Sequence, residues 1–262
     1  MTRNEAPRQI GLARALSKLG YCSRSRAAEL ICAGRVRLNG KIWRDPEAPV
    51  SGKHDRIAID GELVGAQDKI YLMMNKPRGV VTTAADEKGR ETVYGVLNAS
   101  PSTEKKNLPG ECLPWAAPVG RLDKASEGLL LLTNDSEWGA LITAPQTHLD
   151  KSYHVQVGTV ADEEFLQSLI RGVQTQDGQV LRAKQACRLR GGQKNCWLEI
   201  VLAEGKNRQI RRMMEAMGVE VLRLMRVAIG PLQLGDLAKG EYRALTAGEK
   251  RMLDRAMRGR TL

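Results

Sequence analysis

The 262-residue sequence is poor in aromatic residues, which make up 4% of it and include a single Phe. This scarcity argues against a sheet paved with aromatic side chains, the surface on which RRM domains stack RNA bases. Five cysteines are present, but none form a Cys-x-x-Cys pair, so we expect neither a zinc site nor a disulfide framework. No apolar run approaches the roughly 18 residues that cross a bilayer, and the chain opens without an apolar leader. We therefore expect a protein of the reducing cytoplasm with no membrane partner and no metal.

Acidic residues are outnumbered in this chain. The 30 Asp and Glu stand against 41 Lys and Arg, which gives a net charge of +11 and an isoelectric point near 9.6. A polyanionic partner is the simplest explanation, and nucleic acid is the leading candidate. The excess is concentrated between residues 9 and 44, where Glu29 is the only acid.

The same N-terminal region has the pattern of a small module. Residues 12–19 carry apolar side chains at helical spacing, and a capping serine begins a second helical pattern over residues 23–33. Basic and apolar residues then alternate over residues 35–38, and Asn39-Gly40 is a strong hairpin signal. The pattern predicts two short helices followed by a β-hairpin. Its candidate contacts to RNA phosphates are Arg14, Lys18, Arg24, Arg26, Arg35 and Arg37.

A second, larger domain is expected after a polar linker over residues 61–68. Strand patterns occur at residues 69–74, 153–157, 197–202 and 221–227, and helical patterns at 162–171 and 207–217. Strands without regular βαβ alternation favour an α+β domain with a mostly antiparallel mixed sheet and flanking helices. The stretch 98–118 is long for a connection, so we interpret it as a functional loop or a disordered segment.

The most informative segment places Arg121 and Asp123 directly before an apolar run, Leu129 to Leu132. An ionised carboxylate at the edge of a dry core is costly unless a cation pairs with it. By itself the pattern fits either a catalytic carboxylate or an aspartate in a surface ion pair.

Three further motifs decide between these readings. They are Asn75-Lys76-Pro77-Arg78-Gly79, Lys151-Ser152-Tyr153-His154-Val155 and the run from Glu204 to Met213. Together with the Asp123 segment and the N-terminal module, these motifs occur along the chain in the order expected for one family. The sequence resembles the RsuA-type family of ribosomal RNA pseudouridine synthases. The N-terminal module resembles the S4 RNA-binding domain that most members of this family carry.

The resemblance implies an S4 domain over residues 9–66, a catalytic domain over residues 69–250, and a monomer. It implies isomerisation of uridine to pseudouridine in ribosomal RNA without a cofactor. It assigns Asp123 as the essential carboxylate, Tyr153 as the residue that faces the uracil, and Arg211 as the bidentate partner of Asp123. It also implies that a group of cations contacts the RNA: Arg121, Lys76, Arg78, Lys206, Arg208 and Arg212.

Alternatives remain at this point. The motifs look closer to those of large-subunit (23S) enzymes, but a small-subunit (16S) target is the alternative. A non-catalytic RNA-binding or ribosome-assembly factor would keep the fold, although such a protein should have lost Asp123, Tyr153 or Arg211, and all three are present. Nucleotide hydrolysis is excluded because Gly205-Lys206 is not followed by the Ser or Thr of a P-loop.

Overall fold

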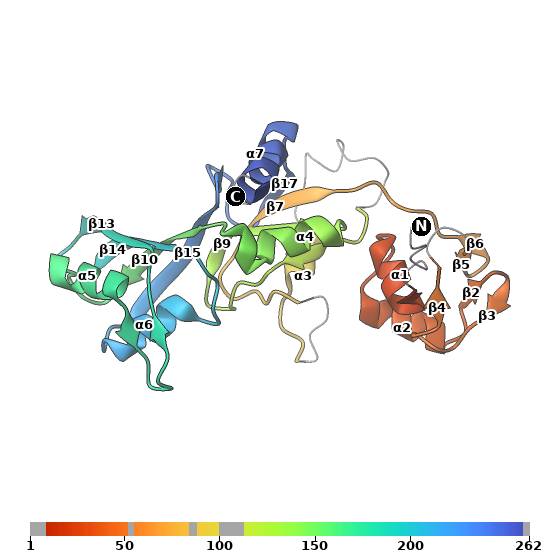
Figure 1. Cartoon of the computed structure of the whole chain (residues 1–262), viewed down its shortest axis with the longest axis horizontal. Coiled ribbons are helices and arrows are strands. Elements are labelled where there is room, and N and C mark those ends of the chain that lie inside the picture. The colour runs from red at the N-terminus through yellow and green to blue at the C-terminus, as the bar shows by residue number, and fades with distance from the viewer. Residues whose placement is uncertain (1–8, 52–54, 84–87, 100–112, 259–262) are drawn as a thin grey trace, which may run out of the picture. The chain divides into compact units, whose positions relative to one another are not determined.

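The structure, a computed structural model, describes residues 9–51, 55–83, 88–99 and 113–258 (Figure 1). Most of the stretch 98–118, interpreted above as a functional or disordered loop, lies outside the described residues. Contacts divide the chain into two compact units. The first comprises Met1–Tyr71, Thr103–Ala117 and Thr133–Ser136, and the second comprises Leu72–Ser102, Pro118–Leu132 and Glu137–Leu262.

Two short helices and a small sheet build the first unit. The helices are α1 (Leu12–Lys18) and α2 (Arg24–Cys32). The sheet has the order β3-β2-β5-β6, with β2 (Val36–Leu38), β3 (Lys41–Ile42), β5 (Ile57–Ile59) and β6 (Glu62–Leu63), and β1 (Ile10–Gly11) pairs with β4 (Pro49–Val50). The prediction of two helices and a hairpin is confirmed. The linker interpretation of residues 61–68 was wrong for Glu62 and Leu63, which pair with β5.

Local sequence signals account for these boundaries. The side chain of Ser23 accepts a hydrogen bond from the Arg26 backbone N–H at 3.1 Å and so caps α2. Asn39 and Gly40 have φ angles of 53° and 81°, which a two-residue hairpin turn between twisted strands requires. Leu12 and Leu16 are completely buried in the core of the unit.

A nine-stranded sheet with the order β13-β14-β10-β15-β9-β7-β17 builds the second unit, and β8 and β16 flank β9 and β15. β9 and β15 are parallel, whereas β13–β14, β14–β10, β10–β15, β15–β16 and β7–β17 are antiparallel. The α+β class with a mostly antiparallel mixed sheet is thereby confirmed. The strands are β7 (Tyr71–Lys76), β8 (Ala117–Val119), β9 (Glu127–Thr133), β10 (Lys151–Val157), β13 (Gln185–Gly191), β14 (Cys196–Leu202), β15 (Val221–Ile229), β16 (Leu232–Gln233) and β17 (Tyr242–Ala244).

Helices and one hairpin complete this unit. The hairpin consists of β11 (Val173–Gln174) and β12 (Val180–Leu181). The helices are α3 (Val93–Ala99), α4 (Ser136–Thr143), the 3-10 helix η2 (Pro145–Thr147), α5 (Glu163–Arg171), α6 (Gln209–Ala216) and α7 (Ala247–Arg258).

The strands β10, β14 and β15 bury one face against α5 and α6. Val155, Leu198 and Leu224 belong to the same buried cluster as Leu169 of α5 and Met213 of α6. The alternation of buried and half-exposed residues along β14 shows that the other face has no such cover. In Figure 1, α5 and α6 lie below these strands, and no described helix lies above them.

β9 and β15 are joined by two residue pairs, Glu127–Met225 and Gly128–Arg226. We call this junction the β9–β15 seam. Gly128 has a φ of 102°, and a Cβ at this position would lie 2.2 Å from the Arg226 carbonyl oxygen. A glycine is therefore required for the two backbones to approach each other. The seam separates β13, β14, β10 and β15 from β9, β7 and β17.

Candidate active site

Asp123 lies in the loop that leads from β8 into β9, a few residues before the seam. Its side chain is 30% exposed, so a substrate can reach the carboxylate. The Ser126 backbone N–H donates to the Asp123 carbonyl oxygen at 2.9 Å, which turns the loop sharply ahead of β9. The fully buried Leu129 to Leu132 then anchor β9 in the core.

Lys76, at the end of β7, holds this loop from the inside. Its Nζ donates to the carbonyl oxygens of Pro77, Asp123 and Ser126 at 3.0, 3.3 and 2.9 Å. The residue is completely buried. Burial lowers the pKa of Lys76 to about 8, against the opposing attraction of Asp123 and Glu127. Lys76 was expected to contact RNA, and in this structure its ammonium group instead donates to the loop that carries Asp123.

Two further groups fix the same loop, and sequence reasoning missed both. The Gly79 N–H donates to the Lys124 carbonyl oxygen at 2.7 Å. The Thr82 hydroxyl donates to the Leu122 carbonyl oxygen at 2.8 Å and accepts from the Leu122 N–H at 3.3 Å. The loop backbone is thus held by bonds on both sides of Asp123. The motif that begins at Asn75 indicated this region, and two of its residues contact the backbone of the loop.

Arg208 forms the ion pair with Asp123, with 3.6 Å between Nη1 and Oδ2. It precedes α6 in a left-handed conformation, with a φ of 49°. Arg211 instead donates through Nη2 to the Ala125 carbonyl oxygen at 3.0 Å. The expected bidentate pair between Arg211 and Asp123 is absent from the described residues, and Arg208 occupies that position.

Arg211 nevertheless lies within the field of Asp123. Burial and the neighbouring charge of Arg208 lower the pKa of Arg211, whereas Asp123 opposes this change. Its Nε is buried and has no partner among the described residues. Two guanidinium groups from the start of α6 therefore frame the loop, one at the carboxylate and one at the backbone.

Tyr153 lies on β10, one strand beyond β15. It is half-buried and packs against the cluster that α6 joins. In the strand register Tyr153 is paired with Arg226, which is in turn paired with Gly128, so the three residues form a line across the seam. At about 4.8 Å per strand, the Tyr153 backbone lies about 10 Å from that of Gly128. Arg226 of β15 lies between these two residues.

Two arginine side chains form hydrogen bonds across the seam, where only two residue pairs join the strands. Arg78 donates to the Leu222 carbonyl oxygen at 3.3 Å, and Arg226 Nε donates to the Leu129 carbonyl oxygen at 2.7 Å. Arg226 is only 6% exposed, and its Nη2 has no partner among the described residues. Arg78 was expected to contact RNA; it is exposed, and it forms one of these hydrogen bonds across the seam.

Glu127 is the second buried charge at the seam, and sequence reasoning missed it too. It is 3% exposed and pairs with Arg223 at 2.5 Å and with Lys239 at 3.4 Å. Burial opposes its ionisation, but the hydrogen bonds from Arg223 and Lys239 prevail and lower the pKa of the carboxyl. An acid immediately before a run of leucines was the available signal.

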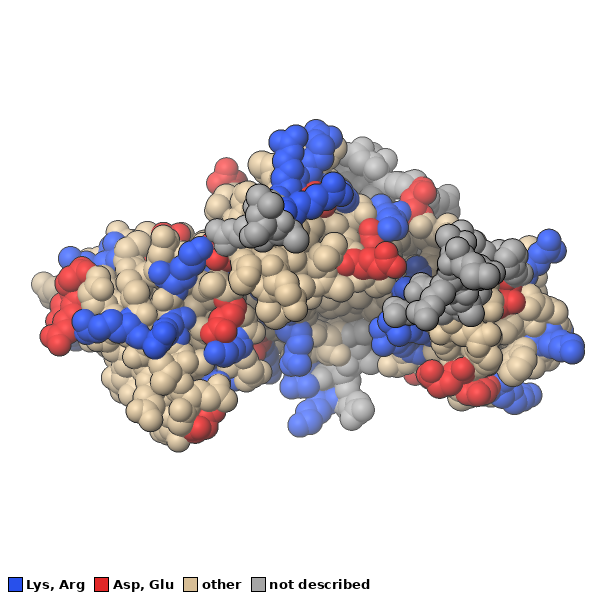
Figure 2. Space-filling model, viewed as in Figure 1, with Lys and Arg blue, Asp and Glu red and all other residues tan. Residues whose placement is uncertain are grey.

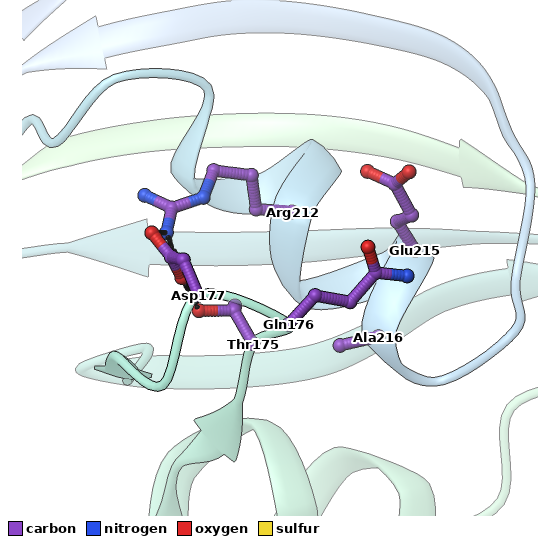
Figure 3. A pocket seen from close by; sticks show the side chains of 6 residues that line it. All are labelled: Thr175, Gln176, Asp177, Arg212, Glu215 and Ala216. Atoms are coloured by element: carbon purple, nitrogen blue, oxygen red, sulfur yellow. Dashed lines mark hydrogen bonds and ion pairs between the residues drawn. The ribbon is translucent and has the colours of Figure 1, made fainter.

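The remaining cations of the expected group are dispersed. Arg121 is exposed, and Lys206 pairs with Glu204 at 2.9 Å. Arg212 turns toward the β11–β12 hairpin, where it pairs with Asp177 at 2.6 Å in a pocket of about 230 Å³ (Figure 3). The Arg212 charge is neutralised there, so the expectation that it contacts RNA has no support in this conformation.

The basic residues of the first unit fall into two groups. Arg26 pairs with Glu29 at 2.8 Å, Arg35 pairs with Asp60 at 2.5 Å, and Arg37 donates to the Gly40 carbonyl oxygen at 3.0 Å. Arg14, Lys18 and Arg24 are exposed, and Arg14 and Arg24 have no partner among the described residues. Figure 2 shows basic side chains on both units, including a group over α7.

The described residues contain no cluster of three or more His, Cys, Asp or Glu side chains that could hold a metal ion. Nor do they include a helix with the length and apolarity to cross a bilayer.

A small basic module and an α+β domain with a partly exposed carboxylate beside two arginines are consistent with an RNA-modifying enzyme. Comparison with known proteins agrees. The family model described as RNA pseudouridylate synthase matches residues 70–216, and the S4 domain model matches residues 10–57. The chain belongs to the RNA pseudouridylate synthase family and carries an N-terminal S4 domain.

Individual relatives cover nearly the whole chain. Ribosomal large subunit pseudouridine synthase B of Bacillus subtilis (strain 168) is 35% identical over 243 residues, which are 92% of this chain and 94% of that protein. The Pseudomonas aeruginosa protein of the same name is 34% identical over 91% of this chain and 60% of its own length. A crystal structure of a pseudouridylate synthase has a TM-score of 0.60 at 28% identity and covers 93% of this chain and 99% of its own.

Proposed function

We propose that this protein converts a uridine of large-subunit (23S) ribosomal RNA to pseudouridine, with Asp123 as the catalytic carboxylate. The observation that carries the proposal is the position of Asp123 on a loop whose backbone is fixed from within by Lys76. The large-subunit target is supported by the two similar proteins that bear that name.

The chemistry requires one carboxylate and no redox partner. The bond between uracil N1 and ribose C1′ breaks, the base turns, a bond forms between C5 and C1′, and the C5 proton moves to N1 in the net reaction. Asp123 acts at the ribose or the base as a carboxylate, with the Arg208 guanidinium beside it at 3.6 Å. The target nucleotide must leave its stack for these atoms to be reached.

Tyr153 and Arg211 have supporting roles in this proposal. The ring of Tyr153 provides a flat wall for the detached uracil, and its hydroxyl is the group in the site suited to accept the C5 proton. Arg211 holds the Ala125 carbonyl oxygen and so sets the distance between α6 and the loop of Asp123. Its contribution is to position the loop, with the partly exposed Arg208 at the carboxylate itself.

The two domains have different roles, RNA docking and catalysis. We assign the S4 domain to residues 9–66 and the catalytic domain to residues 69–250, and the protein acts as a cytoplasmic monomer. The exposed cations Arg14, Lys18 and Arg24 dock the RNA through its phosphates, which places the enzyme without reading sequence. Arg121, beside Asp123, contacts the phosphates near the target nucleotide.

A pseudouridine map of ribosomal RNA tests this function. Cells that lack the protein are compared with cells restored by the wild type or by Asp123→Asn, a nearly isosteric change that removes the charge. Carbodiimide labelling followed by primer extension should show one stop that disappears on deletion and returns only with the wild type. In vitro, Asp123→Asn should lower the single-turnover rate by at least about 10²- to 10⁴-fold, with RNA affinity within a few-fold of the wild type.

Each outcome has a distinct meaning. A stop in 16S RNA would keep the reaction and correct the target. Restoration of the stop by Asp123→Asn would remove the catalytic role of this residue. An unchanged map in both ribosomal RNAs, with RNA binding intact, would favour the non-catalytic assembly factor.

A further inference from the structure

The uncovered face of the β13–β14–β10–β15 sheet carries a row of side chains that the proposed reaction does not use. In the strand register Arg190 is paired with Trp197, Trp197 with Gln156, and Gln156 with Arg223. Directly paired residues project to the same face of a sheet. At about 4.8 Å per strand this row is about 14 Å long. We call it the Trp197 row.

Trp197 lies between two guanidinium groups. The Cζ atoms of Arg190 and Arg223 lie over its ring, at 5.2 and 5.8 Å from the centroid. Both distances are within the range of a cation–π interaction, which helps to hold each guanidinium in place. The row therefore presents ordered donors and planar groups on an open surface.

The two arginines differ in charge balance. Arg223 is neutralised by the buried Glu127, with Nε and Nη2 at 2.5 and 3.2 Å from the carboxylate oxygens. Arg190 is exposed and has no acidic partner among the described residues. Glu199 lies in the next row, where its carboxylate accepts from Cys187 Sγ at 3.8 Å. Arg190 is thus a positioned cation without an acidic partner in the described part of the chain.

A simpler explanation must be weighed. β13 is the edge strand of the sheet, and charged residues on an edge strand prevent pairing with other chains. Arg188 fits that explanation, because it is exposed, unpaired within the described residues, and paired in register with Leu198, on the opposite face. Protection of the edge does not explain why Arg190, two residues after Arg188, is stacked on Trp197.

We infer that the Trp197 row is a second RNA-binding surface, at which Arg190 and Trp197 hold an unpaired segment of the RNA substrate away from the active-site face. Arginine suits this role because its planar fork donates in bidentate fashion to phosphate and stacks on bases. Aromatic and guanidinium planes are the groups that proteins use to hold single-stranded nucleic acid. The inference rests on the proposed function, since the ligand is the RNA that the enzyme modifies.

Arg190→Gln and Arg188→Gln form a matched pair for the test. Both remove one exposed, unpaired charge from the same strand, on opposite faces. Binding of the full-length variants to 23S ribosomal RNA transcribed in vitro is measured across a range of salt concentrations. Arg190→Gln should weaken binding by about tenfold, as for the loss of a hydrogen bond from a charged group. It should also reduce the salt slope by about 0.7 to 0.9, while Arg188→Gln stays within about twofold.

Two further measurements locate the contact. Ultraviolet crosslinking followed by mass spectrometry should recover RNA attached to the peptide that contains Trp197. Trp197→Phe keeps an aromatic ring but supports Arg190 less well, so its affinity should fall between the wild type and Arg190→Gln. The single-turnover rate of Arg190→Gln at saturating RNA should equal that of the wild type.

Equal affinities and salt slopes for Arg190→Gln and Arg188→Gln would overturn the inference, as would a lower rate at saturating RNA with unchanged affinity. The binding comparison is independent of turnover. If the wild type binds this RNA but forms no pseudouridine in it, the proposed function fails while the comparison of the two variants still decides the inference.

Discussion

Lys76 at the end of β7 and Arg14 on α1 carry the same charge in opposite surroundings. Lys76 is completely buried and donates to three backbone carbonyl oxygens, two of them in the Asp123 loop. Arg14 is exposed and has no partner among the described residues. A buried cation shapes its own chain, whereas an exposed and unpaired one is available to an anionic ligand. The difference shows that charge in a motif does not reveal its function until burial is known.

Replacement of the buried Lys76 should have the largest effect on stability and on the reaction rate. Lys76→Met keeps the length of the side chain but leaves three carbonyl oxygens without their donor. The free energy of unfolding should fall by about 3 kcal/mol or more, since each unmet buried group costs about 1–3 kcal/mol. Urea unfolding measures this loss, and a single-turnover assay should show a rate at least about 100-fold lower because the Asp123 loop shifts. RNA affinity lowered in parallel with the rate would instead place Lys76 at the RNA.

The pH dependence of the free energy of unfolding should show whether burial lowers the pKa of Lys76. In the unfolded chain Lys76 has its ordinary pKa of 10.5, and in the folded chain burial lowers the pKa to about 8. Between pH 8 and 10.5 the unfolded chain therefore holds more protons, and the free energy of unfolding rises with pH, by at most about 3 kcal/mol. The difference in stability between the wild type and Lys76→Met should widen over this window. Parallel curves for the two proteins would show that the Lys76 pKa is not lowered.

The two arginines at the start of α6 should differ in their response to lysine. Arg211→Lys removes the guanidinium that reaches the Ala125 carbonyl oxygen, so the rate should fall by about tenfold or more. Arg208→Lys keeps a point charge near Asp123 and should cost only a few-fold. Single-turnover rates of the two variants measure the difference. The reverse order would return Arg211 to the carboxylate and make Arg208 peripheral.

Changes at exposed arginines of the S4 domain should be the mildest. Arg14→Gln/Arg24→Gln removes two unpaired charges, and Arg26→Gln/Arg35→Gln removes two that are already paired with acids. The first variant should lose about fivefold in RNA affinity and about 1.5 in salt slope, since two phosphate contacts leave. The second should change less, and both should keep the wild-type rate at saturating RNA. Equal losses would mean that net charge alone governs docking.

Much of this architecture could be predicted because the signals are local. Helical spacing, the Ser23 cap and the Asn39-Gly40 turn act over a few residues, and all three were read correctly. The position of Asp123 ahead of a buried strand was equally local. The α+β class followed from the order of these elements.

Other features depend on partners far apart in the chain. Glu127 and Arg223 are 96 residues apart in sequence, and only the register of the seam brings them together. The sequence did not reveal that Lys76 is buried, because its burial depends on contacts between β7 and the Asp123 loop, which lie far apart in the chain. Lys76 was therefore predicted to contact RNA. Arg208, and not Arg211, pairs with Asp123, and its backbone is left-handed, a conformation that spacing alone does not show.

The β9–β15 seam has a mechanical consequence. Asp123 belongs to the side of β9, whereas Tyr153, Arg208 and Arg211 belong to the side of β15, and two residue pairs join the sides. A joint this short resists separation along its hydrogen bonds but offers little resistance to rotation about the strand direction. Arg78 and Arg226 make further contacts across it, to the carbonyl oxygens of Leu222 and Leu129. The alignment of the two halves of the sheet therefore depends on arginine side chains as well as on strand pairing.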